Sequence, residues 1–356
     1  MQTNLNQLEP QSLVDAFLKH PPQNFNVQNH ADFLPFFSTD FDLLTTLDTP
    51  VRQRISKLPA YAYWGKLLHL STCFIGTTVT EYSLLSPALA VDVLLRKLKQ
   101  NVRKNTLTII KDLPINSPLL STEENTYSDE LVCQSENQGF ITVEGQALAY
   151  VPIDFQNRAE YLARLSRSRR KNLNRKLKSL DLLRVEVLAT GDSRFANAIF
   201  RDQLYQLYFA VYQQSDIHFD LLSPAFFDAV LQDVQAEGRV FFYWYEEKLV
   251  GYNICYIHRG NLVDKYIGFN YPLALSFNLY FVSWFVNLDY AVQQGLKFYI
   301  AGWTDPEVKA QLGAKFTFTR HLVWIQQPAL RYVLGKFKHL FEADAHWHEQ
   351  KQESST

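Results

Sequence analysis

The sequence is poor in the features that would assign a chemistry directly. Its 356 residues hold three cysteines, Cys73, Cys133 and Cys255, which lie far apart and form no CxxC pair. This usage argues against a disulfide framework or a zinc site and is typical of reduced thiols, so we expect a cytoplasmic protein without a metal centre. A nucleophile elbow, a Walker loop, a dinucleotide fingerprint and an HExxH motif are also missing.

Charge and hydropathy exclude further classes. The formal net charge of −1 argues against a whole-surface nucleic-acid binder such as a DNA-binding protein, although it leaves room for a local basic patch. The first thirty residues are polar and predict no secretory signal. The most apolar helical stretch, 273–292, contains Asp289, and an aspartate costs about 2.5–3.5 kcal/mol at a bilayer centre. We therefore expect a buried helix and no transmembrane segment.

The stretch 239–303 organises the rest of the chain. Three runs rich in β-branched and aromatic residues, separated by Gly, Asn and charged turns, predict an antiparallel meander; they are 240–245, 249–257 and 262–269. A long apolar helix is predicted over 276–294, closed by Gly295. The strand predicted at 297–301 follows at once, so the helix is a crossover back into the same sheet.

The first half of the chain repeats this order of elements. A strand within 61–85 precedes a helix, a strand, a helix and a hairpin, at 87–104, 107–110, 129–138 and 140–151. After its own strand–helix–strand unit the second half continues with a short helix at 305–312 and a strand at 316–325. We expect an α/β (α+β) protein with two similar halves, 1–155 and 156–341, followed by a flexible tail, 342–356.

Between the halves lies a basic amphipathic helix. From Arg158 to Lys178 there are nine Arg or Lys residues and one acid, Glu160, while leucines recur at helical spacing. Arg169 falls on the apolar face, four residues after Leu165, so its guanidinium should pair with an acid or point into a polar cleft. The other basic residues are explained by a solvated face.

Charged residues inside apolar strands are candidates for a site. Alternation along a strand places Asp264 and Tyr266 on one face and Lys265 on the other. A structural ion pair and a functional role both explain this charged pair.

Two further candidates lie later in the chain. The segment 302–309 follows the end of a strand, where ligands of open α/β sheets commonly sit, although Thr304 or Asp305 could equally be a helix N-cap. Arg320 and His321 lie in the last strand, and His321 could transfer protons at neutral pH or be structural.

Several of these segments resemble the BioF2-like branch of the GNAT acyltransferases, which is related to the FemAB-like peptidoglycan aminoacyltransferases. The resemblance rests on the basic helix 161–177 followed by Val-Glu-Val, and on Leu-Val-Gly-Tyr-Asn at 249–253, Asp-Lys-Tyr-Ile-Gly at 264–268, Asn-Leu-Tyr at 278–280 and Lys-Ala-Gln-Leu-Gly at 309–313. It covers about 155–340. The fold it implies is GNAT-like: a mixed, largely antiparallel sheet flanked by helices, with two GNAT-like halves in tandem.

The resemblance implies an N-acyltransferase that moves an acyl group from the thioester of acyl-CoA to an amine, with no permanently bound cofactor. Two alternatives stay open: a FemAB-like transferase that uses aminoacyl-tRNA in cell-envelope precursor synthesis, with helix 158–178 on the RNA, and a non-catalytic binding module. The family's pyrophosphate loop should lie at 270–276, but no glycine is present there. This departure fits the FemAB side, where that loop is commonly missing.

In GNAT folds the donor enters a wedge beside the strand that precedes the long helix, here 262–269. The resemblance therefore makes Asp264 the candidate base and Tyr266 the candidate proton donor to the leaving group. Positions expected to bind substrate are Arg169, Lys265, Trp303, Asp305, Lys309, Arg320 and His321.

Overall fold

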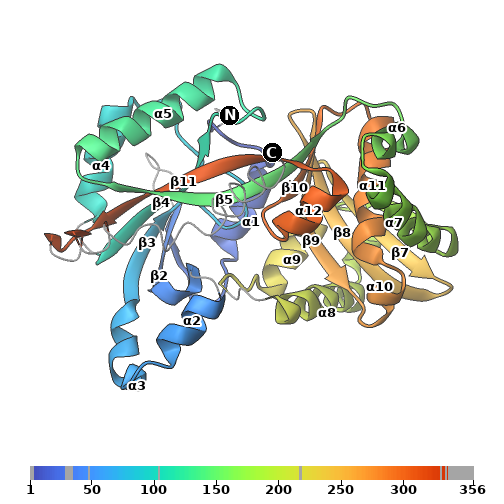
Figure 1. Cartoon of the computed structure of the whole chain (residues 1–356), viewed down its shortest axis with the longest axis horizontal. Coiled ribbons are helices and arrows are strands. Elements are labelled where there is room, and N and C mark those ends of the chain that lie inside the picture. The colour runs from blue at the N-terminus through green and yellow to red at the C-terminus, as the bar shows by residue number, and fades with distance from the viewer. Residues whose placement is uncertain are drawn as a thin grey trace. The chain divides into compact units, whose positions relative to one another are not determined.

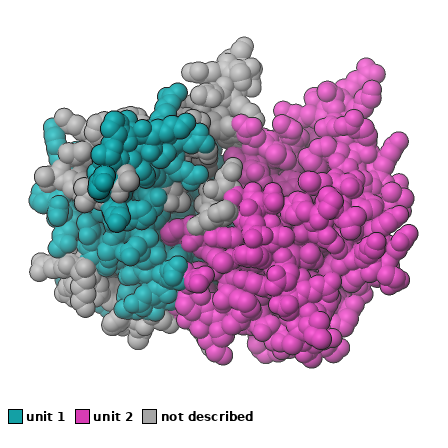
Figure 2. All heavy atoms as spheres, turned by 90° about the horizontal axis from the view of Figure 1, so that it is seen from below, with its two compact units in different colours: residues 1–7, 24–147, 317–356 teal, residues 8–23, 148–316 magenta. Residues whose placement is uncertain are grey.

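The computed structural model describes residues 4–28, 35–46, 49–102, 105–215, 219–328, 331, 332 and 335. The tail expected at 342–356 lies outside them. The chain forms two compact units, coloured separately in Figure 2: unit 1 is 1–7, 24–147 and 317–356, and unit 2 is 8–23 and 148–316. The segments of the two units therefore alternate along the sequence, and no single boundary near residue 155 divides them.

Unit 2 contains the predicted meander. Strands β6 (Arg184–Ala189), β7 (Gly238–Tyr245), β8 (Lys248–His258) and β9 (Asn261–Phe269) pair antiparallel in that order. Strand β10 (Phe298–Gly302) pairs parallel with β9 and antiparallel with the end of β5 (Ile141–Pro152). A parallel pair needs a crossover, which α11 (Leu279–Gln293) provides, so this prediction is confirmed.

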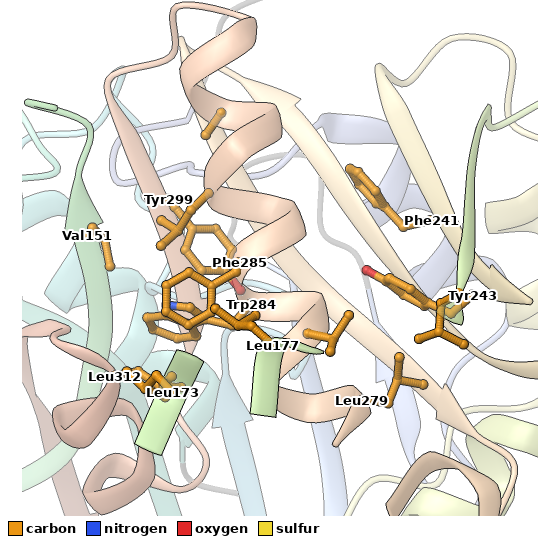
Figure 3. Packing of buried hydrophobic residues seen from close by; sticks show 14 of the residues in the cluster. Val151, Leu173, Leu177, Phe241, Tyr243, Leu279, Trp284, Phe285, Tyr299 and Leu312 are labelled. Atoms are coloured by element: carbon orange, nitrogen blue, oxygen red, sulfur yellow. The ribbon is translucent and has the colours of Figure 1, made fainter. Parts of the chain in front are cut away.

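Both faces of the unit 2 sheet are covered by helices (Figure 1). One face packs against α11 and α7 (Arg167–Leu177) in an apolar core that includes Leu173, Phe241 and Phe285 (Figure 3). The other face packs against α8 (Ala198–Gln214) and α9 (Pro224–Leu231). For example, the hydroxyl of Tyr252 on β8 donates to the Leu204 carbonyl of α8 at 2.9 Å.

Two predicted helices are interrupted. The helix expected over 158–178 is divided into α6 (Arg158–Ala163) and α7, because the Ser166 hydroxyl accepts a hydrogen bond from Arg169 N and starts a new helix. The helix expected over 276–294 begins only at Leu279, as α11, because Asn278 has a φ of 51° and separates it from the short α10 (Leu273–Ser276). A left-handed residue cannot continue a right-handed helix.

Unit 1 repeats the crossover of unit 2. Strands β3 (His69–Ile75) and β4 (Leu107–Ile115) pair in parallel and are joined by α4 (Val91–Val102). The series β3, α4, β4, α5 (Thr122–Asn137) and β5 matches β9, α11, β10, α12 (Pro306–Leu312) and β11 (Lys315–Ile325). The expectation of two GNAT-like halves is confirmed.

The remaining elements of the two units are α1 (Gln11–Lys19), β1 (Asn26–Gln28), β2 (Phe36–Asp42), η1 (Leu43–Thr46), α2 (Thr49–Ser56), α3 (Tyr61–Trp64), η2 (Gly65–Leu68), η3 (Lys178–Leu182) and η4 (Ser193–Ala196).

The hairpin predicted at 140–151 is wrong. Strand β5 runs through Gly145 without a turn. This glycine instead leaves room for the side chains of Thr319 and His321, which lie directly beside it. A Cβ at Gly145 would lie 2.3 Å from Thr319 Oγ1 and 3.0 Å from His321 Nε2. Only a residue without a side chain fits there.

Within the described part of the chain, no helix has both the length and the apolar character needed to cross a membrane.

Candidate functional site

The parallel strands β9 and β10 separate within unit 2. Their paired residues end at Val263 and Ile300. Beyond that point β9 continues beside β8, while Gly302 of β10 pairs with Ala149 of β5. Asp264 is the first residue of β9 past the last pair, and it keeps part of its surface accessible. The pairing of β9 and β10 thus ends at the place where the resemblance puts a wedge, with Asp264 next to it; we call this end of the pairing the opening.

Side chains from two strands and a helix converge on the Asp264 carboxylate. Its Oδ2 accepts hydrogen bonds from the Tyr299 hydroxyl at 2.9 Å and from Asn287 Nδ2 at 3.0 Å. Its Oδ1 faces Asn253 Nδ2 at 3.4 Å and Cys255 Sγ at 3.5 Å. The carboxylate is thus held in one orientation by β8, β10 and α11.

A second set of bonds fixes these partners. Asn253 and Asn287 are fully buried and joined by a bond of 3.1 Å from Asn253 Nδ2 to Asn287 Oδ1. The Tyr243 hydroxyl donates to Asn253 Oδ1 at 2.8 Å, and Figure 3 shows Tyr243 and Tyr299 within the same core. Sequence reasoning missed these residues. The available signal was an asparagine inside an otherwise apolar strand and another inside an apolar helix.

Burial controls the acidity of this carboxyl group. Desolvation raises the pKa of Asp264 above its ordinary value, against the hydrogen bonds from Tyr299 and Cys255 and the charge of Lys309. Desolvation favours the neutral form of an acid, whereas donated hydrogen bonds and a nearby cation favour the anion. A carboxylate with a raised pKa is suited to accept a proton near neutral pH.

Lys309 lies where the sequence predicts a site residue. It is only 4% exposed, and its Nζ donates to the Gly302 carbonyl at 3.1 Å. Gly302 has a φ of +77°, and a Cβ there would lie 4.0 Å from Lys309 Nζ and 3.9 Å from the Asp264 carbonyl oxygen. Trp303 follows in the same segment and is partly buried. The chain therefore brings Lys309 and Asp264 to the same opening.

Asp305 occupies the N-cap position of α12 in a left-handed conformation and is exposed, and its side chain makes no capping hydrogen bond. Asp305 is thus the N-cap residue, one of the two predicted alternatives, but its side chain does not cap the helix.

The prediction that Asp264 and Tyr266 share a face is wrong. A β-bulge lies between them, because Cys255 pairs with Asp264 and the preceding residue, Ile254, pairs with Tyr266. A bulge shifts the side-chain alternation by one residue. Tyr266 consequently packs against Phe226 and Phe227 of α9, on the face opposite to α11.

Lys265 forms a structural ion pair with Glu9. Its Nζ lies 3.4 Å from Glu9 Oε1, and the two side chains are 7% and 0% exposed. Of the two roles left open by the sequence, the structure shows the ion pair.

Arg169 is exposed and donates to the Ala310 carbonyl of α12 at 3.4 Å. Among the residues that the structure describes Arg169 pairs with no acid, so the ion pair that the sequence offered as one alternative is not formed there.

Arg320 and His321 belong to unit 1 and have partners there. Arg320 is paired with Asp129, and His321 Nδ1 accepts a bond from Asp112 N at 3.0 Å. Desolvation lowers the pKa of His321 and favours its neutral form. The described partners of both side chains thus belong to unit 1.

Tyr280 is a candidate that sequence reasoning missed. It lies in the first turn of α11, and its buried hydroxyl has no hydrogen-bond partner among the described residues. Burial raises its pKa, and the nearby charges of Asp305 and Asp264 act in the same direction. The hydroxyl can therefore donate to a bound molecule, and its only signal was the Asn-Leu-Tyr segment.

Most amides in the connection between β9 and α11 are already hydrogen-bonded to backbone carbonyls. The N–H groups of residues 274–278 donate to the carbonyls of Asn270, Pro272, Leu273 and Leu275. A diphosphate bound by backbone N–H groups, as in a GNAT pyrophosphate loop, would need these donors.

The chain matches the FemAB-like family, described as peptidoglycan biosynthesis/recognition, over residues 83–356. A search of curated proteins found no match.

Three solved structures are similar in fold. The C-terminal domain of a protein described as a lysylphosphatidylglycerol synthetase from Agrobacterium fabrum has a TM-score of 0.54 at 10% identity and covers 91% of this chain and 93% of that chain. L-PGS from Bacillus licheniformis has a TM-score of 0.53 at 9% identity, covering 93% and 97%. FemX has a TM-score of 0.51 at 11% identity, covering 93% and 95%.

Proposed function

Because the chain belongs to the FemAB-like family and is a transferase of the FemAB and GNAT-fold kind, we propose that it transfers an aminoacyl group from aminoacyl-tRNA to an amine of a peptidoglycan precursor. The observation that carries this proposal is the opening between β9 and β10 with the Asp264 carboxylate next to it. A reacting carbonyl group can enter there beside an oriented base.

The β9–α11 connection favours an RNA-linked donor over acyl-CoA. CoA carries a diphosphate, whereas the 3′ end of an aminoacyl-tRNA does not require a diphosphate clamp. The amides of residues 274–278 are occupied by backbone carbonyls, and no glycine lies at 270–276 to reshape the segment. Acyl-CoA therefore has less support as the co-substrate.

In the proposed reaction the acceptor amine attacks the ester carbonyl of the donor. A C–N bond forms, and the C–O bond to the terminal ribose of the tRNA breaks. Asp264 takes one proton from the amine and delivers it to the departing ribose oxygen, so that the carboxylate is restored at the end of the cycle. The buried ammonium of Lys309 offsets negative charge that develops in the opening.

Transfer of a radiolabelled amino acid tests the proposal. Pools of charged tRNA, acetyl-CoA and longer acyl-CoAs are offered as donors, with a peptidoglycan precursor bearing a free amine as acceptor. We expect label in the precursor only from charged tRNA, and its loss in Asp264→Asn. Asp289→Asn, on α11 and paired with Arg158, controls for removal of a carboxylate elsewhere. Label from acyl-CoA alone would show that the donor is wrongly assigned.

A further inference from the structure

The exposed face of α7 carries cations that no acidic residue neutralises within the described part of the chain. Between Arg167 and Lys178 there is no acidic residue. The arginines of neighbouring α6 are paired, Arg158 with Asp289 and Arg164 with Asp154 and Glu160. The segment 167–178 holds seven cations, and none of them forms an ion pair with a residue that the structure describes. They are Arg167, Arg169, Arg170, Lys171, Arg175, Lys176 and Lys178.

Four of these cations form a stripe. Arg167, Lys171, Arg175 and Lys178 are exposed and spaced by four, four and three residues, which places them on one side of the helix. At a rise of 1.5 Å per residue the stripe is about 16 Å long. We call these four residues the basic stripe.

The basic stripe fits an RNA duplex better than a bilayer surface. Leu173 and Leu177, the only apolar residues of α7, are buried in the unit 2 core. A helix that lies in a membrane interface inserts an apolar face, and α7 has none left to insert. Cations fixed on a rigid helix can instead contact a row of phosphates, because duplex RNA is recognised mainly through its backbone and shape.

The basic stripe begins beside the opening that contains Asp264. Arg169, in the first turn of α7, donates to the Ala310 carbonyl of α12. The same short helix supplies Lys309, whose Nζ is bonded to Gly302 where β10 leaves β9. A duplex on the stripe would therefore lie close to the opening.

The geometry points to the basic stripe as the surface that binds backbone phosphates of the RNA duplex next to the reactive end of the donor. This inference rests on the proposed function and assigns its donor a binding surface on α7.

Fluorescence anisotropy with a labelled, uncharged RNA hairpin that reproduces an acceptor stem tests the inference. Binding is measured over a series of salt concentrations for the full chain, for Arg167→Gln/Lys171→Gln/Arg175→Gln, and for Arg54→Gln/Lys57→Gln/Lys248→Gln. The second triple variant removes the same charge from exposed positions elsewhere. Matching circular dichroism and melting temperatures confirm that both variants fold.

We expect the stripe variant to bind the hairpin roughly tenfold to a hundredfold more weakly than the full chain at moderate salt. The slope of log affinity against log salt should fall by about 2 to 3, since each phosphate contact contributes about 0.9. The control variant should retain the affinity and slope of the parent.

Equal affinity and slope for both triple variants would overturn the inference, and so would binding of the stripe to phosphatidylglycerol vesicles with no binding to the hairpin. The transfer assay reports on the proposed function separately. If label still passes from charged tRNA while the stripe variant binds the hairpin normally, only the assignment of the surface fails.

Discussion

Asp264 gives the sharpest test of the chemistry, because its carboxylate is oriented by Tyr299 and Asn287 and its pKa is raised. A base works only when ionised, so activity should fall as the pH drops through this raised pKa. The acid limb should thus lie above the ordinary range for an aspartate. Asp264→Asn should lower kcat by about 10²–10⁴-fold, and its pH–rate profile should no longer show the fall in activity at acidic pH. A pH–rate profile of both proteins checks this, and an unchanged limb in the variant would contradict it.

The same raised pKa has a consequence for stability. The folded state holds the Asp264 proton more tightly than the unfolded chain, so the associated stabilisation is present below the pKa of an unfolded aspartate and is lost as the pH rises through the folded pKa. Asp264→Asn cannot ionise. Its free energy of unfolding relative to the parent should therefore increase as the pH rises from about 4, the ordinary pKa of an aspartate, through the raised pKa of the folded state. Urea titrations at several pH values measure this, and a constant difference would contradict the desolvation argument.

Tyr280 and Tyr266 form a matched pair at the residue scale. Both hydroxyls are buried without a partner among the described residues, but Tyr280 lies on α11 and Tyr266 packs against α9 on the other face of the sheet. Tyr280→Phe should lower kcat by roughly tenfold to a hundredfold by removing a donor to the leaving oxygen or substrate. Tyr266→Phe should leave kcat unchanged. Steady-state kinetics decide, and the reverse result would restore Tyr266 to the site.

At the scale of elements, periodicity and turn chemistry were sufficient for the meander β7–β8–β9, the crossover α11 and the parallel strand β10. These features depend on local sequence, and each has its own boundary signal. The bulge after Asp264 could not be predicted in the same way, because a bulge depends on the register with β8 and leaves the local pattern of β9 unchanged.

The candidate site was predictable only in part for the same reason. Asp264 stands out as a charge inside an apolar strand and Lys309 as one in the segment that follows a strand, and both lie at the opening. Asn253 and Asn287 are separated by 34 residues and meet only through the packing of α11 on β8. Single-sequence patterns do not contain that contact.

Gly145 tests the correction to β5. A methyl group at this position would lie 2.3 Å from Thr319 Oγ1, so Gly145→Ala should lower the free energy of unfolding by about 1–3 kcal/mol through overpacking. Removing the opposing hydroxyl in Gly145→Ala/Thr319→Ala should recover part of the loss, with Thr319→Ala alone as reference. A double-mutant cycle from urea unfolding measures the coupling. No coupling would mean that Gly145 has another role, such as the turn that the sequence suggested.

At the scale of the whole molecule, the order of segments along the chain matters for which pieces can fold. Unit 2 includes 8–23 from the N-terminal region and residues 148–152 of β5. Leu13 and Phe17 of α1 are almost fully buried, and Val151 pairs with Tyr299 of β10. A fragment cut at the boundary expected from the sequence would lose these contacts.

The fragment 156–341 should therefore fail to fold alone. Without β5, the backbone groups of β10 lose a partner strand, and without α1 an apolar surface of unit 2 is left uncovered. We expect aggregation or a fluctuating state with little near-ultraviolet circular dichroism. The control is the full chain carrying a protease site between residues 155 and 156. After cleavage its two pieces should stay together in gel filtration and keep the native spectrum, because all contacts are already made. A monomeric, cooperatively melting fragment 156–341 would show that α1 and β5 are dispensable for unit 2.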